Sequence, residues 1–373
     1  MKLTQEQIQQ LETPCLVIDM DLAEKNIRRM QEAADRAGCR LRPHIKTHKM
    51  PLFAGMQIKA GASGITCAKV SEAEVMADGG MEDIFIAYPM IGHFRIQRAI
   101  ALEKRLKRLI LSVDSLEGAE ALNQEACDQD VVLEVRMEID TGAGRTGVPM
   151  DRAVELALAI RQMKHLNLTG IYTFKSLILS GKPTEDNLLA AEEEGDMMAE
   201  TARMLKNKGV RIQDISAGSS PTGALVAQTG KVNEIRPGTY IFDDFMLTKE
   251  KVADISEIAV RFYATVVSCQ HKEYAVVDGG TKCFPTDVVP GLPPFHYPGY
   301  AVAEGNDNLR LSRMNEEHGI ITAINGETGL YVGQVLSLIP IHVCTAVNMQ
   351  NSVYLLENGS LRKQKVDARG MLV

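Results

Sequence analysis

Residues 41–49, which direct the assignment of the fold, read Leu41-Arg42-Pro43-His44-Ile45-Lys46-Thr47-His48-Lys49. His44, Lys46 and His48 stand at every second position, near the start of a strand–helix pattern. In an extended segment alternate side chains share a face, so these three would point the same way. A lysine between imidazoles suits Schiff-base chemistry, because nearby cations and partial burial lower the pKa of such an amine. The simpler alternative is a basic strand end that faces solvent or phosphate.

Outward from this stretch, β-rich runs alternate with helical stretches from about residue 40 to 245. The expected strands are 41–46, 63–67, 84–88, 109–113, 131–139, 168–174, 212–216 and 235–242. Eight strands separated by helices predict an α/β fold, a (β/α)8 TIM barrel. The competing doubly wound sheet would carry Gly-x-Gly-x-x-Gly after its first strand, and the sequence has none there.

Two helices of this region have clear end signals. Ser71-x-x-Glu74 predicts a capping box for a helix that ends at Gly79-Gly80. The charged, amphipathic segment 185–208 predicts a long surface helix.

A second domain is expected from the strand patterns at the two ends of the chain. The run 15–18 is one strand too many for the barrel, and the sequence after residue 250 is strand-rich. Further strands are expected at 257–269, 273–278, 332–339 and 352–356, with a hairpin turn at 357–360. We therefore expect a barrel domain over 20–248 and a mainly antiparallel β domain from 1–19 plus 249–373.

Composition excludes several function classes. A formal net charge of −7 and a pI near 5.7 argue against a nucleic-acid partner. A hydrophobic content of 45% without a long apolar run argues against a membrane span, and the polar N-terminus does not resemble a signal peptide. The seven cysteines, with no Cys-x-x-Cys, suit a reducing compartment, so a cytoplasmic location is predicted.

Four segments fall where a barrel places its catalytic groups, at the carboxyl ends of strands. Lys46 ends the first strand. The glycine-rich loop 140–147 follows another strand and presents Arg145, while 216–222 and 236–240 offer hydroxyl and N–H donors after the last two strands. Each loop alone is more simply a turn. Together, a lysine, a cation and a late-strand phosphate site are typical of pyridoxal phosphate binding.

Seven segments of the chain carry a resemblance to a known family. They are 13–19, 42–49, 68–74, 140–147, 234–240, 316–319 and 340–348. In this order they are similar to the D-threonine aldolase / D-serine dehydratase-like family of pyridoxal-phosphate enzymes, which have the alanine racemase-like fold (fold type III). The resemblance spans about residues 13–370.

The resemblance implies a cofactor site and an assembly. It implies Lys46 as the Schiff-base lysine, Arg145 beside the cofactor ring and Tyr172 close to it. The residues implied to contact the phosphate are Gly218, Ser219, Ser220, Gly238, Thr239 and Tyr240. It also implies a homodimer. One departure concerns 171–176, where Phe174 and Lys175 stand in the neighbourhood in which family members often have a His-Gly pair.

The metal signal is His342-Val-Cys344. On an extended segment these two side chains share a face, and an imidazole with a thiolate suits zinc better than a hard cation. A core cysteine with a structural histidine is the alternative from spacing alone. The resemblance implies that His342 and Cys344 bind a divalent metal, with zinc the first expectation and manganese the second.

The resemblance implies a lyase that acts on a small D-β-hydroxy amino acid. A D-threonine aldolase-type retro-aldol cleavage to glycine and an aldehyde is the first expectation. Dehydration of D-serine or D-3-hydroxyaspartate is the close alternative, and a non-catalytic pyridoxal-phosphate-binding protein is the alternative from another class. His48 and His318 are candidates for an auxiliary base, each with a structural role as its alternative. The loop 281–286 has no recognisable substrate signature.

Overall fold

The computed structural model describes Met1 and residues 3–373, and it contains two compact units. The barrel unit comprises Arg28–Lys46, Met50–Gly238 and Met371–Val373. The β unit comprises Met1–Ile27, Thr47–Lys49 and Thr239–Gly370.

The barrel unit is built on eight strands in which every pair of neighbours is parallel, in the order β2-β12-β11-β8-β6-β5-β4-β3. Their bounds are β2 Arg40–Leu41, β3 Ile65–Cys67, β4 Asp83–Pro89, β5 Arg108–Val113, β6 Leu133–Asp140, β8 Leu166–Tyr172, β11 Asp214–Ala217 and β12 Glu234–Ile235. The sheet closes where the segment after β2 meets β3. His44 forms a parallel bridge with Thr66, whose N–H donates to the Pro43 carbonyl at 2.8 Å. The predicted (β/α)8 barrel is confirmed.

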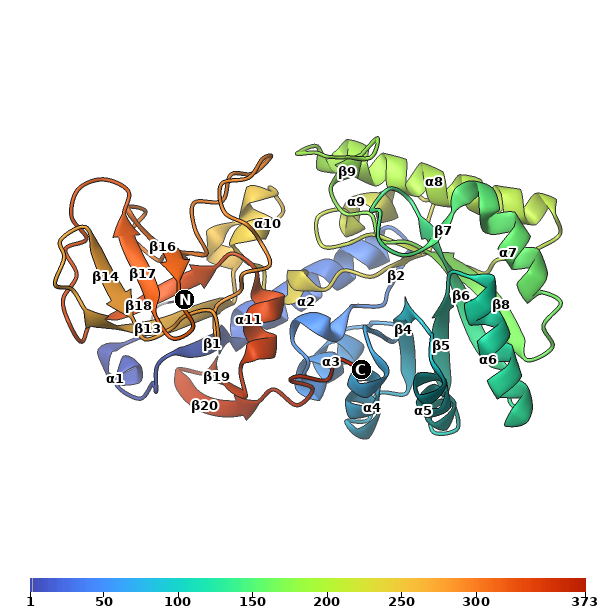
Figure 1. The fold of residues 1–373 in the computed structure, drawn as a ribbon, viewed down its shortest axis with the longest axis horizontal. Helices are drawn as coiled ribbons and strands as arrows, with labels where there is room; N and C mark the ends of the chain where they lie inside the picture. The colour runs from blue at the N-terminus through green and yellow to red at the C-terminus, as the bar shows by residue number, and fades with distance from the viewer. Residues whose placement is uncertain (2) are drawn as a thin grey trace. The chain divides into compact units, whose positions relative to one another are not determined.

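Helices lie outside these strands, as the run from α4 to α8 illustrates (Figure 1). Their bounds are α2 Met20–Arg36, α3 Pro51–Lys59, α4 Val70–Asp78, α5 His93–Glu103, α6 Leu116–Asp128, α7 Ala153–Ile160, α8 Asn187–Asn207 and α9 Gly223–Gln228. The short elements are η1 Ile45–Thr47, β7 Val148–Pro149, η2 Met150–Arg152, β9 Ile178–Leu179 and β10 Lys182–Pro183. Because the helices cover the sheet, its strands are apolar along most of their length; Leu109 to Val113 of β5 are all buried.

Three local predictions in the barrel unit are wrong. Residues 41–46 are a strand only at their first position, because the chain turns into the helix η1 and the Lys46 N–H approaches His44 Nδ1 at 3.3 Å. The last predicted strand is shortened to Glu234–Ile235, since Pro237 and a 3₁₀ helix follow. Ser71 is not a cap: α4 has Lys69 as its N-cap, and the Ser71 hydroxyl donates to the Val373 carbonyl.

The β unit contains one sheet in the order β14-β17-β16-β15-β18-β13-β1-β19-β20, and an additional β13–β14 pairing closes six of these strands into a barrel. The strands are β1 Cys15–Asp19, β13 Val260–Ser268, β14 Tyr274–Val277, β15 Ala301–Ala303, β16 Leu309–Met314, β17 Gly319–Ala323, β18 Val335–Pro340, β19 Ser352–Glu357 and β20 Ser360–Lys365. The helical elements are α1 Gln5–Ile8, η3 Thr239–Ile241, α10 Phe245–Lys249, η4 Ile255–Glu257 and α11 Val343–Met349.

The expected use of the surplus first strand is confirmed. β1 pairs antiparallel with β13 and parallel with β19, so it belongs to the β unit. The predicted hairpin turn is also present, because Asn358 and Gly359 both have positive φ (50° and 74°) between β19 and β20. The sequence did not reveal β15, β16 and β17, which are short or interrupted by polar residues.

The interior of the barrel unit contains a buried cluster of charges centred on Glu234. Arg42 Nε donates to Glu234 Oε2 at 2.9 Å, and Arg136 donates to Glu234 Oε1 at 2.5 Å and to Asp214 Oδ2 at 2.6 Å. Arg42, Arg136 and Glu234 have no exposed surface. Since β6 and β12 are separated by two strands in the sheet, the Arg136–Glu234 pair spans the barrel interior.

Replacing Glu234 by glutamine should destabilise the protein. The change leaves two buried guanidinium groups without their shared counter-charge, which costs about 3–5 kcal/mol in the free energy of unfolding. Urea unfolding followed by circular dichroism measures this loss. The control is Glu200→Gln on α8, where the carboxylate pairs with Arg203 at the surface and the midpoint should not move. Equal midpoints for the two variants would contradict the role of the cluster.

The same cluster predicts how stability depends on pH. Burial alone would raise the pKa of Glu234, but the charges of Arg136 and Arg42 outweigh it and hold that pKa well below its usual value. The pKa of Asp214 is lowered against burial in the same way by Arg136 and Arg40. Because the pKa of each carboxyl group is lower in the folded than in the unfolded protein, both groups stabilise the fold fully above about pH 4.5. This stabilisation is lost as the pH falls further. Urea midpoints at pH 7, 5 and 4 should be similar for the first two and lower for the third; an unchanged midpoint at pH 4 is the contrary result.

Candidate active site

Lys46 lies in the helix η1, directly after β2, in the barrel unit. Its side chain is half-buried, while Ile45 beside it is fully buried and anchors the turn. The Lys46 Nζ lies 5.7 Å from the centre of the Phe174 ring. Because the segment is helical here, alternate residues do not share a face, and the sequence-based grouping of His44, Lys46 and His48 on one side is wrong.

Arg145 approaches the same aromatic ring from the loop after β6. Its guanidinium carbon lies 4.4 Å from the Phe174 centroid, within the range of a cation–π contact. The loop is tightly folded: Gly147 has φ +109°, and a Cβ there would lie 2.6 Å from the Asp140 nitrogen. The structure thus brings the predicted Lys46 and Arg145 together around Phe174, which sequence reasoning had noted only as a departure.

Lys175, the other residue of that departure, points elsewhere. Its Nζ is fully buried, donates to the Ile178 carbonyl at 2.6 Å and pairs with Glu193 of α8. Lys175 therefore holds the 175–180 segment against α8, and its charge is already compensated.

A second group of polar residues surrounds Tyr172 inside the barrel. The Tyr172 hydroxyl lies 2.5 Å from Ser112 Oγ and also hydrogen-bonds Glu138 of β6. Burial raises the pKa of Glu138, and its Oε2 has no hydrogen-bond partner within the described residues. Sequence reasoning missed Glu138, because a single acidic residue on a strand gives no signal of its own.

Arg236 completes this group from the segment after β12. Its guanidinium carbon lies 4.9 Å from the Tyr172 ring, and it donates to Ser216 Oγ at 2.6 Å and to the Thr173 carbonyl at 2.5 Å. Burial lowers the pKa of this guanidinium. A buried cation beside a carboxyl oxygen without a partner is a site that can bind a polar ring.

The loop after β11 is organised by a buried carboxylate. The Gly218 N–H donates to Glu194 Oε1 at 3.0 Å, and the Thr222 hydroxyl donates to Glu194 Oε2 at 3.0 Å. The Arg236 N–H approaches the Gly218 carbonyl at 3.3 Å, which places the predicted segments 216–222 and 236–238 side by side. Ser219 and Ser220 are buried in this loop, and Gly238 is buried in its neighbour.

The next predicted residues, Thr239 and Tyr240, begin the β unit in the helix η3. Tyr240 is buried, and Thr239 Oγ1 lies 3.5 Å from Cys344 Sγ. Thr47, which follows Lys46 in the chain, lies closer to the same sulfur, at 3.1 Å through its hydroxyl. Cys344 thus has two threonine hydroxyls beside it within the β unit.

His342 and Cys344 are brought together, but not by a strand. His342 is the N-cap of α11 and Cys344 lies in its first turn, so the expected extended segment is wrong. The two side chains are hydrogen-bonded to each other, and His342 Nδ1 lies 2.5 Å from Asp287 Oδ2. Burial lowers the pKa of His342, but the sulfur and the Asp287 carboxylate outweigh it and hold the pKa well above its usual value. Among the described residues, no group of three or more His, Cys, Asp or Glu side chains is arranged to hold a metal, so the protein supplies a nitrogen–sulfur pair.

The two candidate bases differ in their environments. His48 is fully buried in the β unit, two residues after Lys46 in the chain. His318 is exposed in the turn between β16 and β17.

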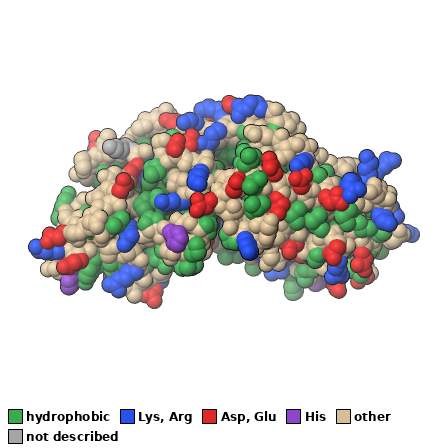
Figure 2. All heavy atoms as spheres, turned by 90° about the horizontal axis from the view of Figure 1, so that it is seen from above, with side chains coloured by type: hydrophobic (Ala, Val, Ile, Leu, Met, Phe, Trp, Pro, Cys, Tyr) green, Lys and Arg blue, Asp and Glu red, His purple; other side chains and the backbone are tan. Residues whose placement is uncertain are grey.

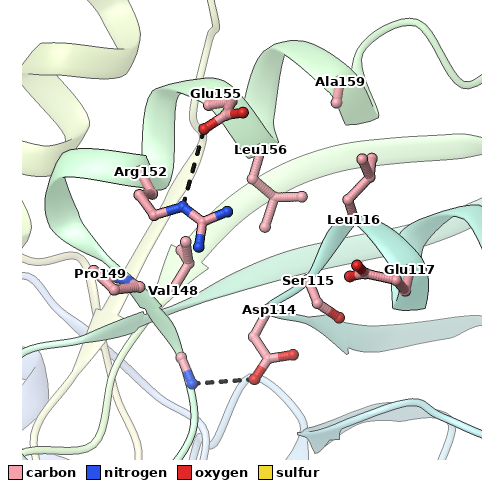
Figure 3. Close-up of a pocket in the computed structure, with 11 residues that line it drawn as sticks. Asp114, Ser115, Leu116, Glu117, Val148, Pro149, Arg152, Glu155, Leu156 and Ala159 are labelled. Atoms are coloured by element: carbon pink, nitrogen blue, oxygen red, sulfur yellow. Dashed lines mark hydrogen bonds and ion pairs between the residues drawn. The ribbon is translucent and has the colours of Figure 1, made fainter.

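A cavity of about 450 Å³ lies between α6 and α7 on the outside of the barrel, and Gly147 of the loop after β6 is part of its lining (Figure 3). Asp114 accepts a hydrogen bond from the Gly147 N–H at 3.2 Å, and Arg152 pairs with Glu155 at 4.0 Å along its wall. The predicted site residues do not line it.

On the face shown in Figure 2, basic and acidic side chains are interspersed and do not separate into patches. Among the described residues, no helix is both long and apolar enough to cross a bilayer.

Two glycines provide a matched test of the loop after β11. Gly218 (φ +81°) and Gly230 (φ +67°) both have backbones that disfavour a side chain, which costs about 1–2 kcal/mol for alanine. A Cβ at Gly218 would also lie 2.7 Å from the Gly223 Cα, whereas nothing lies within 4 Å at Gly230. Gly218→Ala should therefore cost about 1–3 kcal/mol more than Gly230→Ala in the free energy of unfolding. Equal losses in urea titrations would show that the loop yields freely.

Comparison with known proteins extends over nearly the whole chain. The family model for the alanine racemase N-terminal domain matches residues 18–244, and the model for a putative serine dehydratase domain matches residues 259–356. A D-threo-3-hydroxyaspartate dehydratase from Delftia sp. (strain HT23) is 33% identical over 368 residues, covering 94% of this chain and 96% of that protein.

Solved structures agree. A D-threonine aldolase from Filomicrobium marinum is 28% identical with a TM-score of 0.86, covering 97% of both chains. A cysteine-to-alanine variant of a D-threo-3-hydroxyaspartate dehydratase, described as the metal-free form, is 30% identical with a TM-score of 0.87, covering 97% of this chain and 99% of that one. The chain therefore belongs to the D-threonine aldolase / D-serine dehydratase-like family of pyridoxal-phosphate-dependent lyases, with the alanine racemase-like fold.

Proposed function

We propose that the protein is a pyridoxal-phosphate- and metal-dependent lyase that cleaves D-β-hydroxy amino acids, with D-threonine aldolase-type cleavage to glycine and an aldehyde as its reaction. The observation that carries the proposal is the convergence of Lys46 and Arg145 on Phe174 at the carboxyl ends of β2, β6 and β8. Active sites of barrel enzymes are built at this end of the strands.

The residues present fit pyridoxal phosphate. Lys46 offers a half-buried amine, and Arg145 offers a guanidinium cation that lies over the Phe174 ring. Gly218 has no side chain to cover its backbone, and it lies in the same loop as the buried hydroxyl residues Ser219 and Ser220. We propose that these two serines, with Gly218, Gly238, Thr239 and Tyr240, bind the phosphate, and that Tyr172 and Arg236 lie beside the ring. When bound, the cofactor supplies an electron sink for bond cleavage at the substrate Cα.

The residues His342 and Cys344 fit a divalent metal. An imidazole nitrogen and a thiolate are the ligands that zinc prefers, and two protein ligands leave positions for water and substrate. Zinc is our first assignment and manganese the second. Held by His342 and Cys344, such a metal would supply Lewis-acid polarisation of the substrate hydroxyl, the group that an aldolase deprotonates.

The chain's own residues have the following proposed roles. Lys46 binds the cofactor and moves a proton at the substrate, Arg145 orients the ring, and His48 is the auxiliary base. His48 is preferred to His318 because it is buried close in the chain to Lys46, whereas His318 is exposed on a distant turn. A general base must lie within hydrogen-bonding reach of the proton that it takes.

Dehydration of D-threo-3-hydroxyaspartate or of D-serine is the second candidate. It is favoured by the 33% identity to the Delftia dehydratase, which exceeds the 28% identity to a D-threonine aldolase from Arthrobacter sp. A non-catalytic pyridoxal-phosphate-binding protein is the third, and the metal pair in the β unit argues against it. We further propose residues 20–248 as the cofactor domain, 1–19 plus 249–373 as the metal-carrying domain, and a cytoplasmic homodimer; the seven cysteines, all free, suit that compartment.

Product analysis separates these activities. The purified protein, supplied with pyridoxal phosphate and zinc, is incubated with D-threonine, D-serine and D-threo-3-hydroxyaspartate. Glycine with acetaldehyde from D-threonine is the expected result, and it should disappear in Lys46→Ala and after dialysis against a chelator. Oxo acid with ammonia from the other two substrates would instead establish the dehydratase. No product from any of the three would overturn a lyase function on this substrate class.

A further inference from the structure

We propose that Asp287 is a positioning residue for metal binding, which orients the His342 imidazole so that its Nε2 faces the metal. The inference rests on the proposed metal site. Asp287 lies directly after the loop 281–286, to which the sequence assigned no role, and it is separated from His342 by 55 positions in the chain.

The contact between the two side chains is specific. His342 Nδ1 lies 2.5 Å from Asp287 Oδ2, so this nitrogen donates to the carboxylate and Nε2 is the ring nitrogen left for a metal. The other oxygen, Oδ1, accepts a hydrogen bond from Thr345 Oγ1 at 2.8 Å. Both oxygens of Asp287 are therefore engaged by α11 and its N-cap, and rotation of the imidazole would break a charge-assisted hydrogen bond.

Asp287 is held in place by its neighbours in the chain. Phe284 is fully buried, and the centroid of its ring lies 3.9 Å from that of the Phe262 ring. Val288 packs against the apolar cluster that contains Ile341, the residue before His342. One piece of core thus fixes both ends of the Asp287–His342 contact.

The backbone of His342 is fixed as well. Asp244 accepts the Val343 N–H at 3.0 Å, and the Ile341 carbonyl accepts the Met246 N–H at 3.0 Å. With its backbone held from α10 and its ring held by Asp287, the imidazole has one orientation before any metal binds. Carboxylates that orient a metal-ligating histidine in this way typically change metal affinity 10–100-fold when they are removed.

The experiment measures zinc affinity directly. The full-length protein is titrated with zinc ion in competition with a fluorescent chelator, without substrate, for the wild type and the variants His342→Ala, Asp287→Asn, Thr345→Val and Asp307→Asn. We expect Asp287→Asn to weaken zinc binding about 10–100-fold. Thr345→Val, which removes one hydrogen bond to the carboxylate, should weaken it by a smaller factor. Asp307→Asn removes the same charge from an exposed turn of the β unit and should leave the affinity unchanged.

The outcomes separate this inference from the proposed function. If His342→Ala abolishes zinc binding but Asp287→Asn binds as tightly as the wild type, the metal site stands and the positioning role is wrong. If the wild type and His342→Ala bind zinc equally, the proposed metal site itself is wrong. Should Asp287→Asn fail to fold, Thr345→Val decides: unchanged zinc affinity in that variant overturns the inference, and weakened affinity with an unchanged melting temperature supports it.

Discussion

The buried ion pairs of Glu234 are the constraint on which the barrel unit and its site depend. Glu234 of β12 binds Arg42, just after β2, and Arg136 of β6, and Arg136 also binds Asp214 of β11. The segments that follow these four strands carry Lys46, Arg145, the loop at Gly218, and Gly238. Three fully buried ions at 2.5–2.9 Å cannot separate without leaving an uncompensated charge, so the starting points of these segments are fixed relative to one another.

Much of this architecture could be predicted from residues 41–49 outward, because its signals are local. Apolar runs, helix-ending glycines and the Asn358-Gly359 turn depend on neighbouring residues, and they indicated the number of barrel strands and the hairpin of the β unit. The ion cluster could not be predicted, since it joins residues 98 and 192 positions apart. The helices at 45–47 and 343–349 were also missed. The alternating polarity of these residues predicted extended strands, whereas the backbone turns into a helix at both places.

The site residues divide in the same way. Lys46 and Arg145 were predicted from motif position, and the structure adds what the motifs lacked: a common aromatic ring, Phe174, between them. Glu138 and Glu194 were not singled out, although each is buried and makes or lacks a hydrogen bond in a way that shapes the site. Arg236 was included only as the first residue of the donor segment 236–240. In the β unit, Asp287 similarly has no sequence signal, and its meaning comes only from contact with His342.

The central claim is that Lys46 binds pyridoxal phosphate, and covalent trapping tests it most directly. The purified protein is loaded with the cofactor, reduced with borohydride, digested and mapped by mass spectrometry. The account predicts one phosphopyridoxyl modification, on the peptide that contains Lys46. The Lys46→Ala variant, treated with pyridoxal phosphate in the same way, should not be modified. Modification of another lysine with Lys46 unmodified, or no modification at saturating cofactor, would contradict it.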